Sequence, residues 1–89
     1  MRRAAKVDVN QPEIVAALRK VGCTVQSLAA VGKGVPDLLV GYQGKTYLLE
    51  VKHGKWTLTP DQVEWHNNWR GGPLCVIDSI EQAIEAIRK

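Results

Sequence analysis

Two acidic residues and a lysine lie in neighbouring apolar segments of this chain. Asp37 belongs to Val-Pro-Asp-Leu-Leu-Val-Gly, and Glu50 and Lys52 belong to Leu-Leu-Glu-Val-Lys. Because the second segment is typical of a strand, Glu50 and Lys52 extend their side chains from the same face. Charged groups inside an apolar strand must be paired, hydrated or bound to a metal ion. We therefore take this trio as the first candidate for a chemically active site.

The alternative for the Glu-x-Lys pair is a simple ion pair, which is its commoner role when it stands alone. Asp37 argues against that role, because it precedes Glu50 by 13 positions and begins another apolar segment. A turn through Gln43-Gly44-Lys45 would fold the two segments into a hairpin. Pairing Tyr42 roughly with Thr46 then brings Asp37 within reach of Glu50.

The rest of the chain predicts the elements that position this trio. We expect one α/β domain over residues 1–89, with a mixed central sheet flanked by helices in the order αβββαβα. The first three strands form an antiparallel meander, and the fourth follows a helical crossover and runs parallel to a neighbour. The predicted helices cover residues 11–21, 59–70 and 79–89, and the predicted strands cover 23–30, a segment starting at 37, a segment ending near 52, and 74–77.

Composition and charge allow several classes of protein. The chain has 89 residues, 45% of them hydrophobic and 24% charged, which is ordinary for a folded domain. Its net charge of +3 allows a polyanionic partner without proving one. No apolar run reaches the roughly 18 residues that a membrane-spanning helix needs. We expect a cytoplasmic protein with no membrane partner.

The residues that could bind a metal ion favour oxygen ligands. Cys23 and Cys75 are too few and too far apart for a zinc motif. His53 should point away from the Lys52 face of its strand, and His66 lies on a predicted helix, so no set of His and Cys ligands emerges. Carboxylate and carbonyl oxygens remain, and they favour Mg2+ or Mn2+ over zinc.

These motifs together resemble the PD-(D/E)xK nucleases, and among them the small stand-alone VRR-NUC domains of phages and bacteria. The resemblance runs from about Pro12 to the C-terminal helix. It implies a restriction-endonuclease-like fold and a metal-dependent, structure-selective DNA endonuclease without a small-molecule cofactor, acting as a homodimer on four-way (Holliday) junctions. The matching residues are Glu13, Gly34-Val35-Pro36-Asp37, Glu50-Val51-Lys52 and Gln62.

The resemblance also implies a role for each matching side chain. Asp37 and Glu50 would hold Mg2+ or Mn2+ together with the backbone carbonyl of Val51. Glu13 would bind the ion directly or through water. Lys52 would orient the attacking water or stabilise the negative charge of the transition state. Gln62 would lie near the catalytic lysine.

Helix capping is an alternative explanation for two of these residues. Asn10 and Glu13 form Asn-x-x-Glu, and Thr59 and Gln62 form Thr-x-x-Gln, and both patterns are capping boxes. For Glu13, the cap is the better explanation until the family resemblance is considered. For Gln62, the cap and a place beside the lysine can coexist.

Basic residues suit a phosphate backbone near the acids. Three of them lie in residues 1–9, which we expect to be a flexible basic segment. Two further functions stay open: a nicking or flap-type DNA nuclease, and a non-catalytic nucleic-acid-binding module on the same fold. The predicted DNA contacts are Arg2, Arg3, Lys6, Lys33, Lys45 and Lys55.

Overall fold

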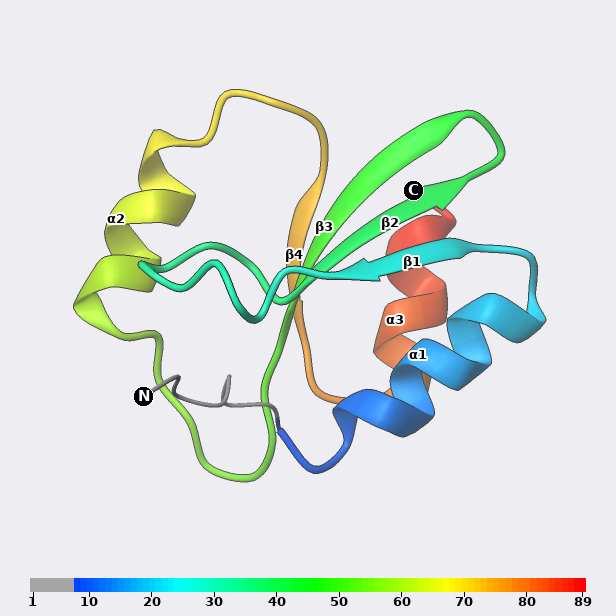
Figure 1. Cartoon of the computed structure of the whole chain (residues 1–89), viewed down its shortest axis with the longest axis horizontal. Helices are drawn as coiled ribbons and strands as arrows, with labels where there is room; N and C mark the ends of the chain where they lie inside the picture. Colours follow the sequence, from blue (N-terminus) through cyan, green and yellow to red (C-terminus); the bar gives the residue numbers. More distant parts are fainter. Residues whose placement is uncertain (1–7) are drawn as a thin grey trace.

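Four strands form one mixed sheet in the computed structural model, which describes residues 8–89 (Figure 1). The strands lie in the order β1-β2-β3-β4; β1, β2 and β3 pair antiparallel, and β3 and β4 pair parallel. The predicted meander, crossover and order of elements are confirmed. The elements are α1 (Gln11–Lys20), β1 (Thr24–Ser27), β2 (Leu38–Tyr42), β3 (Lys45–Val51), α2 (Pro60–Asn68), β4 (Leu74–Ile77) and α3 (Ile80–Ile87).

Helices α1 and α3 pack together on one face of the sheet and build the core (Figure 1). Alternate residues of β3, among them Tyr47, Leu49 and Val51, face this core and are buried, because side chains of a strand alternate between its faces. The phenol of Tyr47 donates a hydrogen bond of 2.9 Å to the carbonyl of Ile87 and so ties α3 to the sheet. None of the helices within residues 8–89 has the length and apolar character to cross a membrane.

The β2–β3 hairpin differs by one residue from the predicted pairing. Tyr42 pairs with Lys45 rather than with Thr46. Gln43 and Gly44 have φ of 49° and 80°, so they form a two-residue turn of the type that matches strand twist. Lys45 therefore belongs to the strand and not to the turn. Since Leu38 pairs with Leu49, this register sets position 37 opposite position 50.

The first strand is shorter than the predicted 23–30. It ends at Ser27, whose hydroxyl accepts a hydrogen bond from the Ala29 amide, and a turn follows in which Val31 donates to the Leu28 carbonyl. This local bonding replaces the ladder because side chains of Ser favour turns over strands. Helix α2 likewise ends at Asn68, two residues before the predicted end at residue 70.

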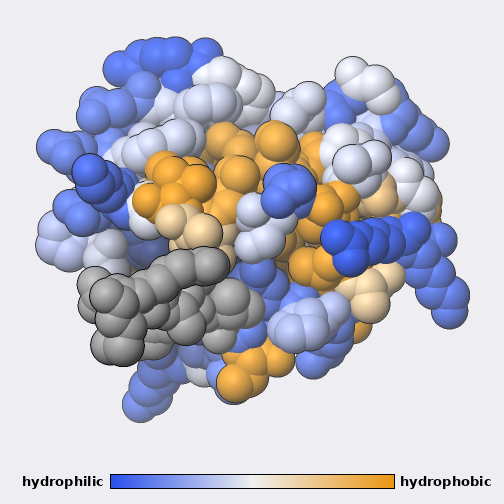
Figure 2. Space-filling view, viewed as in Figure 1, coloured by the Kyte–Doolittle hydropathy of each residue, from blue (hydrophilic) through white to orange (hydrophobic). Residues whose placement is uncertain are grey.

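Helix α2 lies at the other face of the sheet and contributes no fully buried residue. Trp65 and Trp69 pack only partly against the sheet. The two rings stack on each other with centroids 5.1 Å apart, and Trp69 remains 38% exposed. Leu39, on the face of the sheet opposite the core, is also 38% exposed. Figure 2 shows apolar surface between α2 and the β2–β3 hairpin.

The first turn of α2 is held close to the loop that leads into β2. Gly34 has φ of 85°, and a Cβ atom built on it would lie 2.2 Å from the Asp61 carbonyl oxygen and 2.9 Å from the Gln62 amide nitrogen. A methyl group cannot fit against backbone at these distances. Gly34 therefore fixes how closely α2 approaches the strand that carries Asp37.

We predict that Gly34→Ala lowers stability more than Gly32→Ala. Both glycines have positive φ, which costs an alanine about 1–2 kcal/mol. Only Gly34 has backbone within 4 Å of the added methyl group, so only Gly34→Ala must displace α2 as well. Thermal unfolding followed by circular dichroism gives the two melting temperatures, and tryptophan fluorescence reports on the stacked pair of α2. Equal melting temperatures would contradict the close packing.

Candidate active site

At the end of β3, the Asp37 side chain accepts the hydrogen bond that a backbone carbonyl of the neighbouring strand would otherwise accept. Its Oδ2 atom accepts a hydrogen bond of 2.8 Å from the Val51 amide. The amides of Leu48 and Lys52 donate to the carbonyls of Pro73 and Ile77 on the β4 side, so the backbone groups of Val51 face β2 instead. The Asp37 carboxylate is thereby fixed at the point where β2 and β3 separate.

Pro36 leaves the carbonyl of Val51 without a sheet donor. The pairing of Leu38 with Leu49 puts position 36 opposite position 51. Proline has no amide hydrogen, so it cannot donate the bond that an antiparallel ladder would supply here. The carbonyl of Val51, predicted from the family resemblance as a metal ligand, is therefore free to accept another partner beside Asp37.

Glu50 lies at the centre of a polar network that joins β3 to α2. Its side chain is 2% exposed, and its Oε2 atom accepts a hydrogen bond of 3.1 Å from Gln62 Nε2. Lys52 Nζ lies 3.8 Å from the same Oε2 and donates a bond of 2.8 Å to Gln62 Oε1. The amide of Gln62 therefore bridges the buried acid and the lysine.

The capping role of Gln62 coexists with this bridge, as expected. The Thr59 hydroxyl caps α2 by accepting a hydrogen bond of 3.2 Å from the backbone N–H of Gln62. In return, the side-chain Oε1 of Gln62 accepts a bond of 3.0 Å from the backbone N–H of Thr59. The same Oε1 atom also accepts from Lys52. The capping box thus fixes the rotamer that places Gln62 between the lysine and Glu50.

His66 also reaches the site, although its position in the sequence alone gives it no role there. Its Nε2 atom lies 3.8 Å from Glu50 Oε1, and its side chain is 12% exposed. His66 follows Gln62 by four positions on α2, and residues at this spacing share a helix face. That spacing is the sequence signal that could have identified His66, once Gln62 was assigned to the site.

Burial and neighbouring acids shift the protonation of the network. Burial and the neighbouring Asp37 carboxyl together raise the pKa of Glu50 to about 8, against the opposing effect of the Lys52 charge. The charge of Asp8, just before α1, also raises the pKa of Glu50, by a smaller amount. Burial, and then the charge of Lys52, lower the pKa of His66. The site therefore holds a carboxylic acid and a neutral imidazole side by side near neutral pH.

The predicted capping box of Asn10 and Glu13 does not form. Asn10 makes no side-chain cap; its Nδ2 instead donates to the carbonyls of Lys52 and Asp78, at 2.9 and 3.1 Å. Glu13 is exposed on α1. The start of α1 is therefore tied to the end of β3 through Asn10, and the ligand role of Glu13 stays a prediction.

Four buried polar atoms of the described residues have no hydrogen-bond partner. Two belong to Glu50 and His66, and two belong to Asn10 and its neighbour Gln11. Unpaired polar atoms in the interior cost free energy and are rare, so a group of them near one strand end indicates a place for a ligand or water. Sequence reasoning missed Asn10 and Gln11 because the pattern there is that of an ordinary helix start.

The donors at this strand end suit a hard divalent cation. Asp37, Glu50 and the Val51 carbonyl offer oxygen atoms, and Glu50 Oε1 is buried and unpaired. Within residues 8–89, no three His, Cys, Asp or Glu side chains stand together as a ready-made metal site. Two carboxylates, one carbonyl and several waters form a typical set for Mg2+. A cation there would also offset the repulsion between the two acids.

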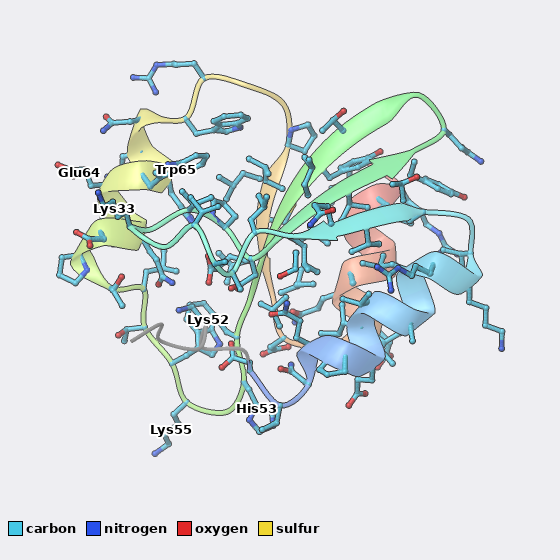
Figure 3. All side chains as sticks on the ribbon, viewed as in Figure 1. Lys33, Lys52, His53, Lys55, Glu64 and Trp65 are labelled. Atoms are coloured by element: carbon cyan, nitrogen blue, oxygen red, sulfur yellow. The ribbon has the colours of Figure 1, made fainter. Side chains whose placement is uncertain are left out.

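The predicted DNA contacts are distributed unevenly around this site. Figure 3 shows Lys33 beside α2 and Lys55 in the loop after β3, both on the α2 side of the molecule. Lys45 begins β3, five residues before Glu50, and so lies at the far end of the strand. Arg2, Arg3 and Lys6 lie outside the described residues.

Comparisons with known proteins add no relative. No protein-family model, curated protein or solved structure matches this chain. The class of the protein is therefore inferred from the α/β architecture and from the buried site of acids, lysine and amide described above.

We predict that the metal-free protein loses stability as pH rises from 6.5 to 8.5. The folded-state pKa of Glu50, about 8, lies above its ordinary value of 4.5, so its contribution is full below pH 4.5 and is lost as pH rises towards 8. The loss over this window should be on the order of 1–2 kcal/mol. Urea unfolding at each pH, in the presence of EDTA, measures it.

Glu50→Gln is the control for this pH dependence, since the amide keeps the size of the side chain but does not titrate. The range from pH 6.5 to 8.5 lies above the ordinary pKa of 6.5 for a histidine. The pKa of His66 is lowered from that value, so its titration affects stability only at lower pH. A wild-type protein whose stability is constant from pH 6.5 to 8.5, like that of the variant, would contradict the raised pKa of Glu50.

Proposed function

We propose that this chain is a Mg2+- or Mn2+-dependent DNA endonuclease with a restriction-endonuclease-like fold, similar to the stand-alone VRR-NUC domains. The observation that carries the proposal is the buried Glu50 carboxyl, which has Asp37 on one side and the Lys52–Gln62 pair on the other. A purely structural ion pair would need neither the second acid nor the unpaired Glu50 oxygen. The mixed sheet with its meander and helical crossover agrees with this class of fold.

Each residue of the site has a role in the proposed hydrolysis. Asp37, Glu50 and the Val51 carbonyl would hold the divalent ion, which when bound stabilises charge on the phosphate oxygens and lowers the pKa of a water. Lys52 has three N–H groups and donates one to Gln62, so it keeps donors for the attacking water or the scissile phosphate. Gln62 orients this ammonium and keeps it next to Glu50.

We further propose that the substrate is branched DNA, with the four-way junction first, and that the active form is a homodimer. Symmetric cleavage of a junction needs two active sites related by a two-fold axis. One subunit would supply one such site, with Asp37 and Glu50, so two subunits are needed. The apolar surface that includes Leu39 and Trp69, each 38% exposed, offers area that a dimer could bury. Lys33 and Lys55 lie on the α2 side of the molecule (Figure 3), where they could contact a phosphate backbone.

Cleavage of defined DNA forms tests the substrate and the activity together. The full chain is incubated with fluorescent four-way junction, flap and linear duplex, each with Mg2+, Mn2+ or EDTA, and the products are mapped on every arm. Paired symmetric nicks in the junction are expected. Preferential flap cutting would select a flap-type nuclease instead, and binding without any metal-dependent product would leave a non-catalytic binding module.

We predict that Lys52→Ala lowers the cleavage rate by roughly 10²–10³-fold, the usual effect of removing a group that stabilises the transition state. Metal and DNA affinity should persist, because the acids and the other basic residues remain. Lys55→Ala is the matched control, since Lys55 is exposed in the following loop. It should weaken DNA binding slightly and leave the rate at saturating DNA unchanged. Undiminished cleavage by the Lys52 variant would exclude the catalytic role.

We predict that Asp37→Asn removes metal binding and metal-dependent cleavage while the protein stays folded. The amide oxygen of asparagine can still accept the hydrogen bond from Val51, so the end of β3 keeps its geometry. The negative charge that attracts the ion is lost. Isothermal titration calorimetry with Mn2+ measures the affinity, and an unchanged value in a folded variant would rule out Asp37 as a ligand.

A further inference from the structure

Glu50 on β3 and His66 on α2 each have an unpaired atom that lies close to the other. Glu50 Oε1 and His66 Nε2 are 3.8 Å apart, both are buried, and neither has a hydrogen-bond partner. The other oxygen of Glu50 is already engaged by Gln62 and lies near Lys52. The free oxygen is therefore the one that faces the imidazole.

The separation of these atoms fits a shared ion better than a direct bond. A distance of 3.8 Å is too long for a hydrogen bond between nitrogen and oxygen. With metal–ligand bonds of about 2.1 Å, two ligands of one ion lie about 3.0 Å apart at right angles and about 4.2 Å apart in line, and the observed 3.8 Å falls between these limits. Both atoms also carry lone pairs that otherwise stay buried and unused.

We propose that His66 is a nitrogen ligand of the divalent ion, together with Glu50, and that it makes the site prefer a transition-metal ion such as Mn2+ over Mg2+. The inference rests on the proposed nuclease function and specifies its cofactor. Imidazole nitrogen binds transition metals well, whereas Mg2+ prefers carboxylate, carbonyl and water oxygen. The all-oxygen donor set expected from the sequence thereby gains one nitrogen.

Helix α2 brings His66 to the site by the same contacts that position Gln62. The two residues are one helical turn apart on one face, and the capping box at Thr59 fixes the start of the helix. The close approach of Gly34 to the Asp61 carbonyl sets the distance between α2 and the β2 strand. Metal preference is therefore a property of α2, while the two acids come from the sheet.

Metal affinity of variants of the metal-free full chain tests the assignment. Mn2+ and Mg2+ are each titrated by calorimetry into wild type, His66→Ala and His66→Gln, with His53→Ala as the matched control. His53 is exposed in the loop after β3, away from α2 (Figure 3). Both His66 variants should lower the ratio of Mn2+ affinity to Mg2+ affinity by about tenfold. The His53 variant should leave the ratio unchanged.

A spectroscopic signal identifies the ligand directly. Electron spin-echo measurements on bound Mn2+ should show coupling to an imidazole 14N nucleus in wild type and in the His53 variant, but not in either His66 variant. The glutamine variant retains a polar side chain of similar reach, so it gives the comparison even if the alanine variant does not fold.

The outcomes separate this inference from the proposed function. Metal binding that Asp37→Asn abolishes, combined with an unchanged affinity ratio or a retained 14N signal in the His66 variants, overturns only the role of His66. Absence of any Mn2+ or Mg2+ binding by the wild-type chain overturns the proposed function and this inference together. A lowered ratio with loss of the 14N signal establishes His66 as a ligand.

Discussion

The burial of the Glu50 carboxyl is the constraint on which the rest of the site depends. A side chain that is 2% exposed cannot keep a charge without partners, and burial together with Asp37 raises its pKa to about 8. Groups from different elements stabilise the buried carboxyl. Gln62 donates to one carboxyl oxygen, Lys52 adds a positive charge, and the other oxygen stays unpaired beside His66. A second acid at such a position makes sense when a cation joins the site, because repulsion between two carboxyls then becomes attraction to a shared ion.

Core and site are built by different helices. α1 and α3 bury the apolar face of the sheet, and α2 contributes no fully buried residue. α2 is instead fixed by polar contacts and by one close backbone approach: the capping box at Thr59, the bridge from Gln62 to Glu50, and the contact of Gly34 with the Asp61 carbonyl. α2 is therefore held to the sheet mainly by polar groups, whereas α1 and α3 are held by the apolar core. The end of β3, by contrast, is tied to the core, because the Asn10 side chain links the Lys52 carbonyl to the start of α1.

Local sequence rules predicted most elements, and their failures have local causes. The order of helices and strands, the parallel fourth strand and the capping box at Thr59 followed from periodicity and turn residues. The hairpin register was wrong by one residue because the two-residue turn at Gln43 and Gly44 leaves Lys45 in the strand. The cap at Asn10 failed because its amide bonds to Lys52 and Asp78, which are more than 40 positions away. Long-range polar contacts of this kind leave no periodic signal in a sequence.

The sequence by itself determined which chemical groups stand on β2 and β3: strand alternation puts Glu50 and Lys52 on one face, and the short turn brings Asp37 within reach of Glu50. Those relations depend on spacing within one hairpin. Only the tertiary structure decided which side chains α2 adds to the site. The position of that helix depends on its contacts with the loop at Gly34 and with the Glu50 carboxyl. Gln62 and His66 acquire their partners there. A residue's spacing fixes its face, but burial and partners come from segments that meet only when the chain folds.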